Sequence, residues 1–233
     1  MKYPETPRDS VVERLHDVEV PDPYRWLEDP EAPAVREWTE KQNALTQATL
    51  DAVPGREALR ARLTELFSMG AIGTPKVRAG RYFYQRREGT QNQPILYVRE
   101  GVHGQDRILV DPTTFSEDGT AALDWWFPSP DGKLLAYGIS LHGSEKSTLR
   151  VRVVDTGEDL ADEIPHTRYS SVAWLPDASG FYYTRYPEPG SVPAGEENYW
   201  RKAYFHPLGR PWKEDPLFFG EGRAREDMIG LAL

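Results

Sequence analysis

The chain has 233 residues, enough for one large or two small domains with a buried core, and 39% of them are hydrophobic, 12% aromatic and 28% charged. Its formal net charge of −9 argues against a nucleic-acid partner, because nonspecific affinity for nucleic acid comes mainly from Lys and Arg neutralising phosphates. No apolar run approaches the roughly 20 residues that span a bilayer, so we expect no membrane partner.

The chain begins Met-Lys-Tyr-Pro-Glu, which lacks the apolar core of a secretory signal. It contains no cysteine, so disulfides and thiolate metal sites are excluded. These two features favour a cytoplasmic location.

Residues 1 to about 30 are rich in Pro, Asp and Arg, which predicts an extended, turn-punctuated arm rather than a helix. The segment 22–29 within it reads Asp-Pro-Tyr-Arg-Trp-Leu-Glu-Asp. Two large aromatic residues in a polar arm need a surface to pack on, so we expect Tyr24 and Trp26 to be its docking anchors. Packing is favoured over ligand binding for both side chains.

Helical periodicity follows from about Pro33 to Ala52 and again from about Arg56 to Ser68, with Val-Pro-Gly between them. Each predicted helix has one apolar face. Two amphipathic helices and an arm are too little for an independent core, so we expect residues 1–70 to dock on something larger.

After residue 70 the pattern changes to alternation with turn signals. Apolar and aromatic residues surround Pro-Asp-Gly at 130–132, and weaker copies occur on both sides. The predicted turn glycines Gly80, Gly132 and Gly180 are about 50 residues apart, a period typical of four-stranded propeller blades. Residues 71–233 are therefore predicted to form part of a β-propeller.

The predicted strands group into three blades of four. A Pro-, Gly- and Glu-rich loop is expected at 187–198, and 228–233 should begin the first strand of a fourth blade. The strands are expected near 74–77, 82–86, 95–99 and 107–110; 121–127, 134–140, 149–155 and 160–164; 170–174, 181–186, 201–206 and 217–219.

Three blades and one strand cannot close a ring, since propellers have at least four blades. An open arc would expose apolar blade faces at both ends. The fold class is therefore mainly β, an incomplete propeller preceded by a helical arm, and the chain is expected to be the N-terminal part of a larger protein.

The sequence contains no nucleophile elbow, zinc-binding helix, phosphate loop or dinucleotide turn. Its five histidines show no ligand-like spacing, so we interpret them as surface or core residues. We expect no catalytic residue, cofactor or metal site within these residues.

Three segments carry a resemblance to a known family: the octapeptide 22–29, Thr-Gln-Asn-Gln at 90–93 before Ile-Leu-Tyr-Val, and Leu-Val-Asp-Pro at 109–112 followed by Ser-Glu-Asp-Gly-Thr. They resemble the N-terminal portion of the prolyl oligopeptidases, and the likeness covers essentially the whole chain. The related oligopeptidase B family usually has a basic residue where Glu28 stands and lacks Gln-Asn-Gln, so it is the poorer match.

The resemblance implies a serine peptidase with a seven-bladed propeller covering an α/β-hydrolase domain, whose catalytic Ser, Asp and His lie beyond Leu233. It implies that the first 70 or so residues wrap onto that domain and that the propeller admits only short proline-containing peptides. Tyr169 stands where the family usually has a Phe lining the substrate pocket, and Met228 matches a pocket methionine. The Tyr hydroxyl is a departure from the family pattern.

Two functions stay open at this point. The chain is either the gating and docking part of a post-proline serine endopeptidase, or part of a noncatalytic propeller scaffold that binds proteins or peptides. The sequence that follows Leu233 would separate them, because only the first predicts a nucleophile elbow there.

Overall fold

The computed structural model describes residues 3–89 and 91–232; Thr90 and Leu233, both named above, lie outside the described residues. The chain divides into two compact units, one ending at Leu66 and the other starting at Phe67. No helix of the described residues is long and apolar enough to cross a membrane.

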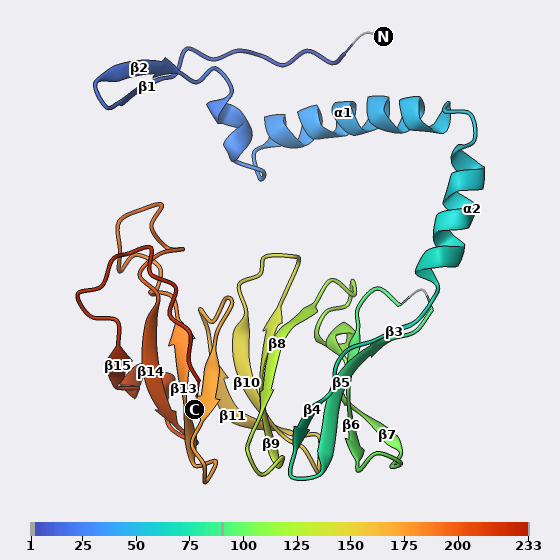
Figure 1. The fold of residues 1–233 in the computed structure, drawn as a ribbon. Helices are drawn as coiled ribbons and strands as arrows, with labels where there is room; N and C mark the ends of the chain where they lie inside the picture. Colours follow the sequence, from blue (N-terminus) through green and yellow to red (C-terminus); the bar gives the residue numbers. More distant parts are fainter. Residues whose placement is uncertain (1–2, 90, 233) are drawn as a thin grey trace. The chain divides into compact units, whose positions relative to one another are not determined.

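The first unit contains a two-stranded hairpin and two α-helices (Figure 1). Both α-helices form where the periodicity predicts them. Pro33 begins the longer helix, where its missing N–H costs nothing. The elements are β1 (Val12–Leu15), β2 (Val18–Pro21), the 3₁₀-helix η1 (Arg25–Glu28), α1 (Pro33–Asp51) and α2 (Arg56–Phe67).

The β1–β2 hairpin agrees with the prediction of an extended, turn-punctuated arm, but the pairing of its two strands was not predicted. His16 and Asp17 form its two-residue turn with φ of +50° and +66°, the conformation that suits the twist of a tight hairpin. This turn usually carries Asn-Gly or Asp-Gly, so the sequence offers no signal for it. An ion pair of 2.7 Å from Arg25 to Glu13 ties β1 to the 3₁₀-helix that follows.

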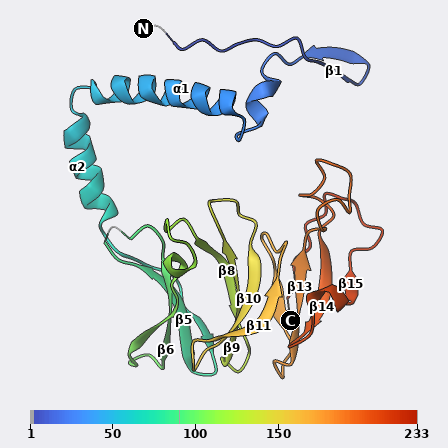
Figure 2. The same ribbon diagram turned by 180° about the vertical axis from the view of Figure 1, so that it is seen from behind.

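The second unit consists of three antiparallel sheets, each a meander, which Figures 1 and 2 show side by side in chain order. These are the predicted blades, and the first gains a short extra strand. Sheet one contains β3 (Ala71–Ile72), β4 (Lys76–Arg78), β5 (Arg81–Arg87), β6 (Ile95–Glu100) and β7 (Asp106–Val110). Sheet two contains β8 (Ala122–Pro128), β9 (Leu134–Ser140), β10 (Thr148–Val153) and β11 (Asp159–Ile164). Sheet three contains β12 (Val172–Trp174), β13 (Gly180–Arg185), β14 (Lys202–Pro207) and β15 (Leu217–Phe219).

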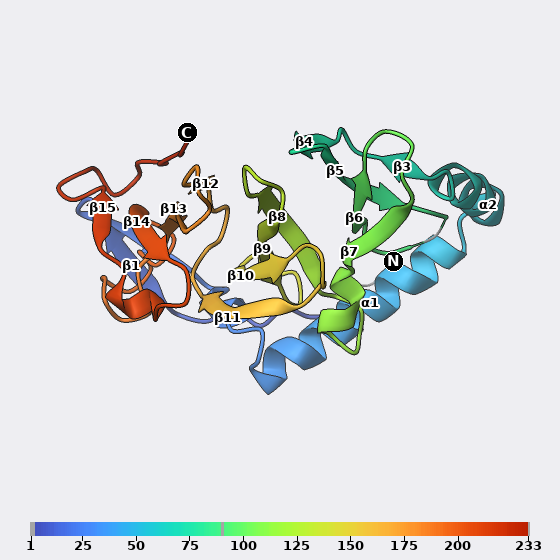
Figure 3. The same ribbon diagram turned by 90° about the horizontal axis from the view of Figure 1, so that it is seen from below.

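Two further 3₁₀-helices, η2 (Pro112–Phe115) and η3 (Trp212–Glu214), belong to the connections of this unit. Figure 3 shows the three sheets as successive layers, with β7, β11 and β15 as the outer strands. The predicted loop at 187–198 lies in the connection between β13 and β14.

The hydrophobic core fills the spaces between neighbouring sheets. Strand β9 shows why: Leu135 and Tyr137 belong to the cluster shared with sheet one, whereas Ala136 between them belongs to the cluster shared with sheet three. Successive side chains of a strand point to opposite faces, so a central blade must be apolar on both. This explains the nearly continuous apolar run at 134–139.

The turn assignments are correct for Gly80 and Gly132, which have φ of +81° and +68°, and wrong for Gly180. Gly180 begins β13, and a Cβ on it would lie 2.5 Å from the carbonyl oxygen of His206. Ala178 takes the left-handed position instead, with φ of +57°. Gly180 is thus required by the close approach of β14 and not by the turn.

The first strand of a fourth blade is not observed over 228–232. A strand requires a backbone ladder, but the Leu231 N–H donates to the Ser171 hydroxyl at 3.0 Å, and that hydroxyl lies 3.2 Å from the Leu231 carbonyl oxygen. The segment is held beside β12 by a side chain.

Candidate functional site

Several loops meet at one end of the three sheets. In an antiparallel meander alternate connections lie at the same end, so the β9–β10, β11–β12 and β13–β14 loops gather there, together with the chain after β15 (Figure 1). Loops positioned by a rigid sheet commonly carry binding residues. Both predicted substrate-binding residues lie in these segments.

Tyr169 lies in the β11–β12 loop, is 52% exposed and has a φ of +47°. Its hydroxyl donates to Glu145 of the β9–β10 loop at 2.6 Å, and Arg168 binds the same carboxylate oxygen at 2.6 Å. These two donors lower the pKa of Glu145. The Arg168 guanidinium also lies 4.9 Å from the centre of the Tyr169 ring. The hydroxyl that distinguishes this position from Phe thus binds a carboxylate of the neighbouring sheet.

Met228 lies in the segment after β15 and is 67% exposed. Its Sδ accepts a weak hydrogen bond of 3.9 Å from Tyr186, whose backbone N–H donates to the His166 carbonyl oxygen at 2.9 Å. Arg201 fixes the same segment by donating to the Ile229 carbonyl oxygen at 2.8 Å. Met228 is therefore held on the edge that carries Tyr169, with its side chain open to solvent.

Trp26 packs within the first unit. Its ring meets Trp38 of α1 edge to face, with centroids 6.4 Å apart, and its indole N–H donates to the Pro7 carbonyl oxygen at 2.9 Å. Tyr24 is 42% exposed. The two predicted anchors therefore differ: Trp26 holds the arm on α1, while much of Tyr24 is accessible.

A polar triad that the sequence analysis missed occurs once in each sheet. In each, a Tyr of β5, β9 or β13, a cation of the next strand and an Asp in or just before the strand after that form hydrogen bonds or ion pairs of 2.6–3.1 Å. The networks are partly buried in the first two sheets and buried in the third, and paired networks of this kind favour one arrangement of the strands. The triads are Tyr84, Arg99 and Asp106; Tyr137, Arg152 and Asp159; and Tyr183, His206 and Asp215.

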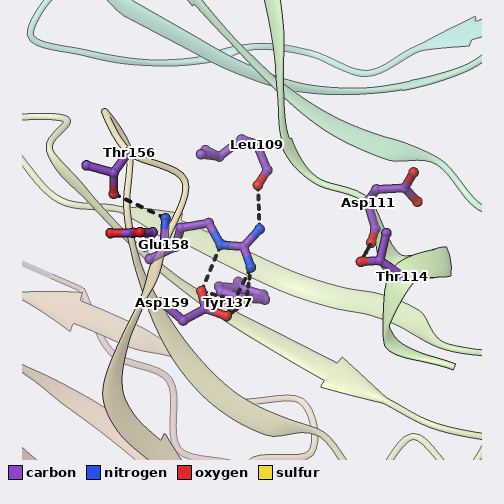
Figure 4. A network of polar contacts seen from close by, with 8 residues as sticks. Leu109, Asp111, Thr114, Tyr137, Thr156, Glu158 and Asp159 are labelled. Atoms are coloured by element: carbon purple, nitrogen blue, oxygen red, sulfur yellow. Dashed lines mark hydrogen bonds and ion pairs between the residues drawn. The ribbon is translucent and has the colours of Figure 1, made fainter.

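The cations of sheets two and three also reach back to the preceding sheet. Arg152 donates to the carbonyl oxygen of Leu109 at 2.6 Å, and Figure 4 shows Leu109 beside the Tyr137–Asp159 pair. His206 binds Asp162 at 2.9 Å. Leu109 and Asp162 each stand three residues after the triad Asp of their sheet in sequence. Imidazole is shorter than guanidinium, so a side-chain carboxylate replaces the backbone carbonyl as acceptor.

His206 is completely buried, and its ring nitrogens lie 2.9 Å from Asp162 and 2.9 Å from Asp215. Burial alone would lower its pKa, but the hydrogen bonds to the two carboxylates outweigh this effect and raise the pKa to about 9. Burial also raises the pKa of Tyr183. A histidine without solvent access cannot exchange protons with a substrate, so this cluster is structural, as the sequence analysis interpreted the histidines.

The described residues contain no group of three or more His, Asp and Glu side chains suited to hold a metal ion. The loop edge presents the hydrogen-bonding side chains of Tyr169 and Glu145 and the apolar side chain of Met228.

Comparison with known families agrees with this architecture. Residues 4–233 match the model described as "Prolyl oligopeptidase, N-terminal beta-propeller domain". The chain belongs to this family. It is 33% identical to the prolyl endopeptidase of Elizabethkingia meningoseptica over 99% of its length, and 32% identical to prolyl oligopeptidase A of Galerina marginata over 92%. It spans 32% and 33% of those relatives, about a third of their length.

Solved structures of the family show the same fold. One from a structural and mechanistic analysis of two prolyl endopeptidases has a TM-score of 0.84 and 40% identity, covering 93% of this chain and 32% of that one. Galerina marginata prolyl oligopeptidase B, bound to a 25mer macrocyclization substrate, has a TM-score of 0.79 and 26% identity, covering 94% of this chain and 34% of that one. The resemblance found from the sequence is thereby confirmed.

A sequence signal for the triads did exist. Arg follows Tyr by 15 residues in the first two blades (84 to 99, 137 to 152), and Asp follows Arg by 7 (99 to 106, 152 to 159). In the third blade the β13–β14 loop lengthens the first interval and His replaces Arg, which hides the repeat. A search at fixed spacing would have found two of the three.

Proposed function

We propose that the chain is the gating and docking part of a serine endopeptidase that cleaves short peptides after proline, with the catalytic triad lying beyond Leu233. The family match over 4–233, in a chain that spans about a third of relatives called prolyl endopeptidases, carries this proposal. The chemistry would be acyl transfer from a serine of an α/β-hydrolase domain, with histidine as the base. A cytoplasmic location is part of the proposal and fits the cysteine-free sequence.

The first prediction concerns activity. The 233-residue polypeptide alone should not hydrolyse a chromogenic Gly-Pro-anilide peptide, whereas the longer parent protein should. The reason is that the proposal places the nucleophilic serine and its histidine base beyond Leu233. Initial rates of both proteins on the same peptide test this. Hydrolysis by the 233 residues alone, or a parent without an α/β-hydrolase sequence, would contradict the proposal, and the latter would favour the binding scaffold.

The proposal assigns residues 1–70 to docking on the hydrolase domain and 71–233 to the propeller, with Tyr24 and Trp26 as docking residues. Helix α2 supports the docking assignment, because none of its side chains is buried and several of its exposed side chains are large and apolar. An apolar face of this kind marks an interaction surface. The exposed apolar side chains are Leu59, Leu63, Leu66 and Phe67.

Replacing Leu63 with Asp tests the docking. In the parent protein it should lower the free energy of unfolding by about 2–3 kcal/mol, because a charge would be buried at the contact. In the 233-residue chain it should change stability by less than about 0.5 kcal/mol, since Leu63 is already 42% exposed. Arg60→Asp on the same helix is the matched control. Equal effects of Leu63→Asp in both proteins would rule out docking through this face.

Tyr169 and Met228 are proposed to contact the substrate residue upstream of the proline. Removing the ring in Tyr169→Ala should raise KM for peptides with an apolar residue there about fivefold to tenfold, with kcat nearly unchanged, because ground-state and transition-state binding are lost together. Tyr169→Phe keeps the ring and removes only one of the two donors to Glu145, so its effect should be smaller. Tyr199, 39% exposed in the β13–β14 loop, supplies the control Tyr199→Ala. An unchanged KM in Tyr169→Ala would remove this residue from the pocket.

A further inference from the structure

A cavity lies where β13 ends and β14 begins, beside the loop that joins them. Its volume is about 600 Å³, within the range of small-ligand sites. Two cations, Arg185 and Lys202, line it together with the aromatic rings of Trp200 and Tyr204. Loop residues 187–192 complete its wall. Neither Tyr169 nor Met228 belongs to this lining.

Arg185 is the unusual residue of this cavity. Its side chain is only 9% exposed, and its guanidinium lies 4.0 Å from the Tyr204 ring centre and 4.9 Å from that of Trp212. Its Nε is buried without a hydrogen-bond partner. Within residues 3–89 and 91–232, no carboxylate lies within the 4.0 Å of an ion pair to it. A buried cation without a counter-charge is costly, so an anion bound beside Arg185 would be stabilised.

The charges around Arg185 strengthen this conclusion. Lys202 stands directly opposite it in the β13–β14 register, and like charges in that position repel. Lys202 pairs with Glu221 at 2.7 Å, a carboxylate whose side chain is 76% exposed. Glu188 lines the cavity but is itself exposed and makes no ion pair with Arg185 in the described structure. The buried guanidinium is left as the group that needs an anionic partner.

We propose that this cavity binds the carboxylate group of a peptide. The two anionic oxygens would accept hydrogen bonds from the two terminal nitrogens of Arg185, a bidentate pairing that a planar guanidinium favours. The Tyr204 and Trp212 rings beside the guanidinium restrict its rotation. Pro187, Val192 and Trp200 supply apolar walls for the rest of the peptide.

Binding by calorimetry on the full protein tests the assignment, with a proline-free acetylated dipeptide ending in a free carboxylate, its C-terminal amide and inorganic phosphate as probes. The acid should bind at least about tenfold more tightly than the amide, because a hydrogen-bonded charge contributes this much. It should also bind more tightly than phosphate. Because the readout is binding of an uncleavable peptide, failure here leaves the proposed peptidase function untouched.

Variants locate the site. Arg185→Gln should weaken acid binding about 10- to 100-fold. Arg185→Lys keeps the charge but not the paired N–H donors of the guanidinium, so it should weaken binding less. The control is Arg223→Gln, at an exposed arginine outside the cavity, which should leave binding unchanged. Glu188→Gln should strengthen binding by removing a like charge at the mouth. Equal binding of acid and amide, preference for phosphate, no binding, or no effect of Arg185→Gln would each overturn the proposal. If Glu188→Gln lowered the stability of the fold without strengthening acid binding, Glu188 would be the partner of Arg185 within the chain. That result would also overturn the proposal.

Discussion

Replacing His206 with Gln is expected to lower the free energy of unfolding of the second unit by about 3–5 kcal/mol, because removing the cation of a buried ion pair leaves its carboxylates buried without a counter-charge. Asp162 and Asp215 are 5% and 9% exposed and would lose their shared cation. Urea denaturation followed by tryptophan fluorescence measures the difference, because Trp174 and Trp212 pack beside this cluster.

The same residue should make stability depend on pH. Its pKa in the folded protein is about 9, above the ordinary value of 6.5, so the imidazolium stabilises the fold fully below pH 6.5. This contribution declines as pH rises and is gone above about 9, a total loss of roughly 3 kcal/mol. The slope between these values should be absent in His206→Gln.

His103→Gln provides the control for both measurements. His103 is an exposed histidine of the same unit, so its replacement should alter neither the stability nor the pH profile. If wild type kept its stability from pH 6.5 to 9, or if His206→Gln showed the same slope as wild type, the charged state assigned to His206 would be wrong.

Arg152→Met should destabilise the second unit by about 2–4 kcal/mol, because it breaks the partly buried pair with Asp159 and the bond to Leu109 of the preceding sheet. Methionine preserves most of the aliphatic stem, so the change reports on the guanidinium rather than on packing. Since the lost bonds join two sheets, the urea transition should move to lower concentration as a single step.

Arg150 on the same strand offers a matched comparison. It pairs with Glu163, but the two side chains are 32% and 55% exposed, so Arg150→Met should cost less than about 1 kcal/mol. Similar losses in the two variants would show that the triad cation contributes no more than a surface charge.

Local patterns predicted most of the second unit. Alternation and turn residues located its three meanders, and β9 was predicted at its observed bounds of 134–140. The errors lie where local signal is weak or misleading. The β1–β2 turn lacks glycine, Gly180 serves a close approach between strands instead of a turn, and 228–232 reads as a strand but makes no backbone ladder.

The candidate sites divide in the same way. Tyr169 and Met228 came from resemblance to the family, and their positions on one loop edge depend on the meander that the pattern predicted. The hydrogen bond from Tyr169 to Glu145 could not be predicted, and neither could the unpaired, buried Nε of Arg185. Each depends on which groups the folded chain brings within a few ångströms.

The order of side chains along the chain determined the propeller blades, the two helices and the family, because periodicity and motifs are properties of neighbouring residues. Tertiary structure alone decided that His206 is charged between two carboxylates and that Arg185 is buried without one. The strength of an electrostatic interaction depends on distance and on exclusion of water, and neither is set until separate strands pack together.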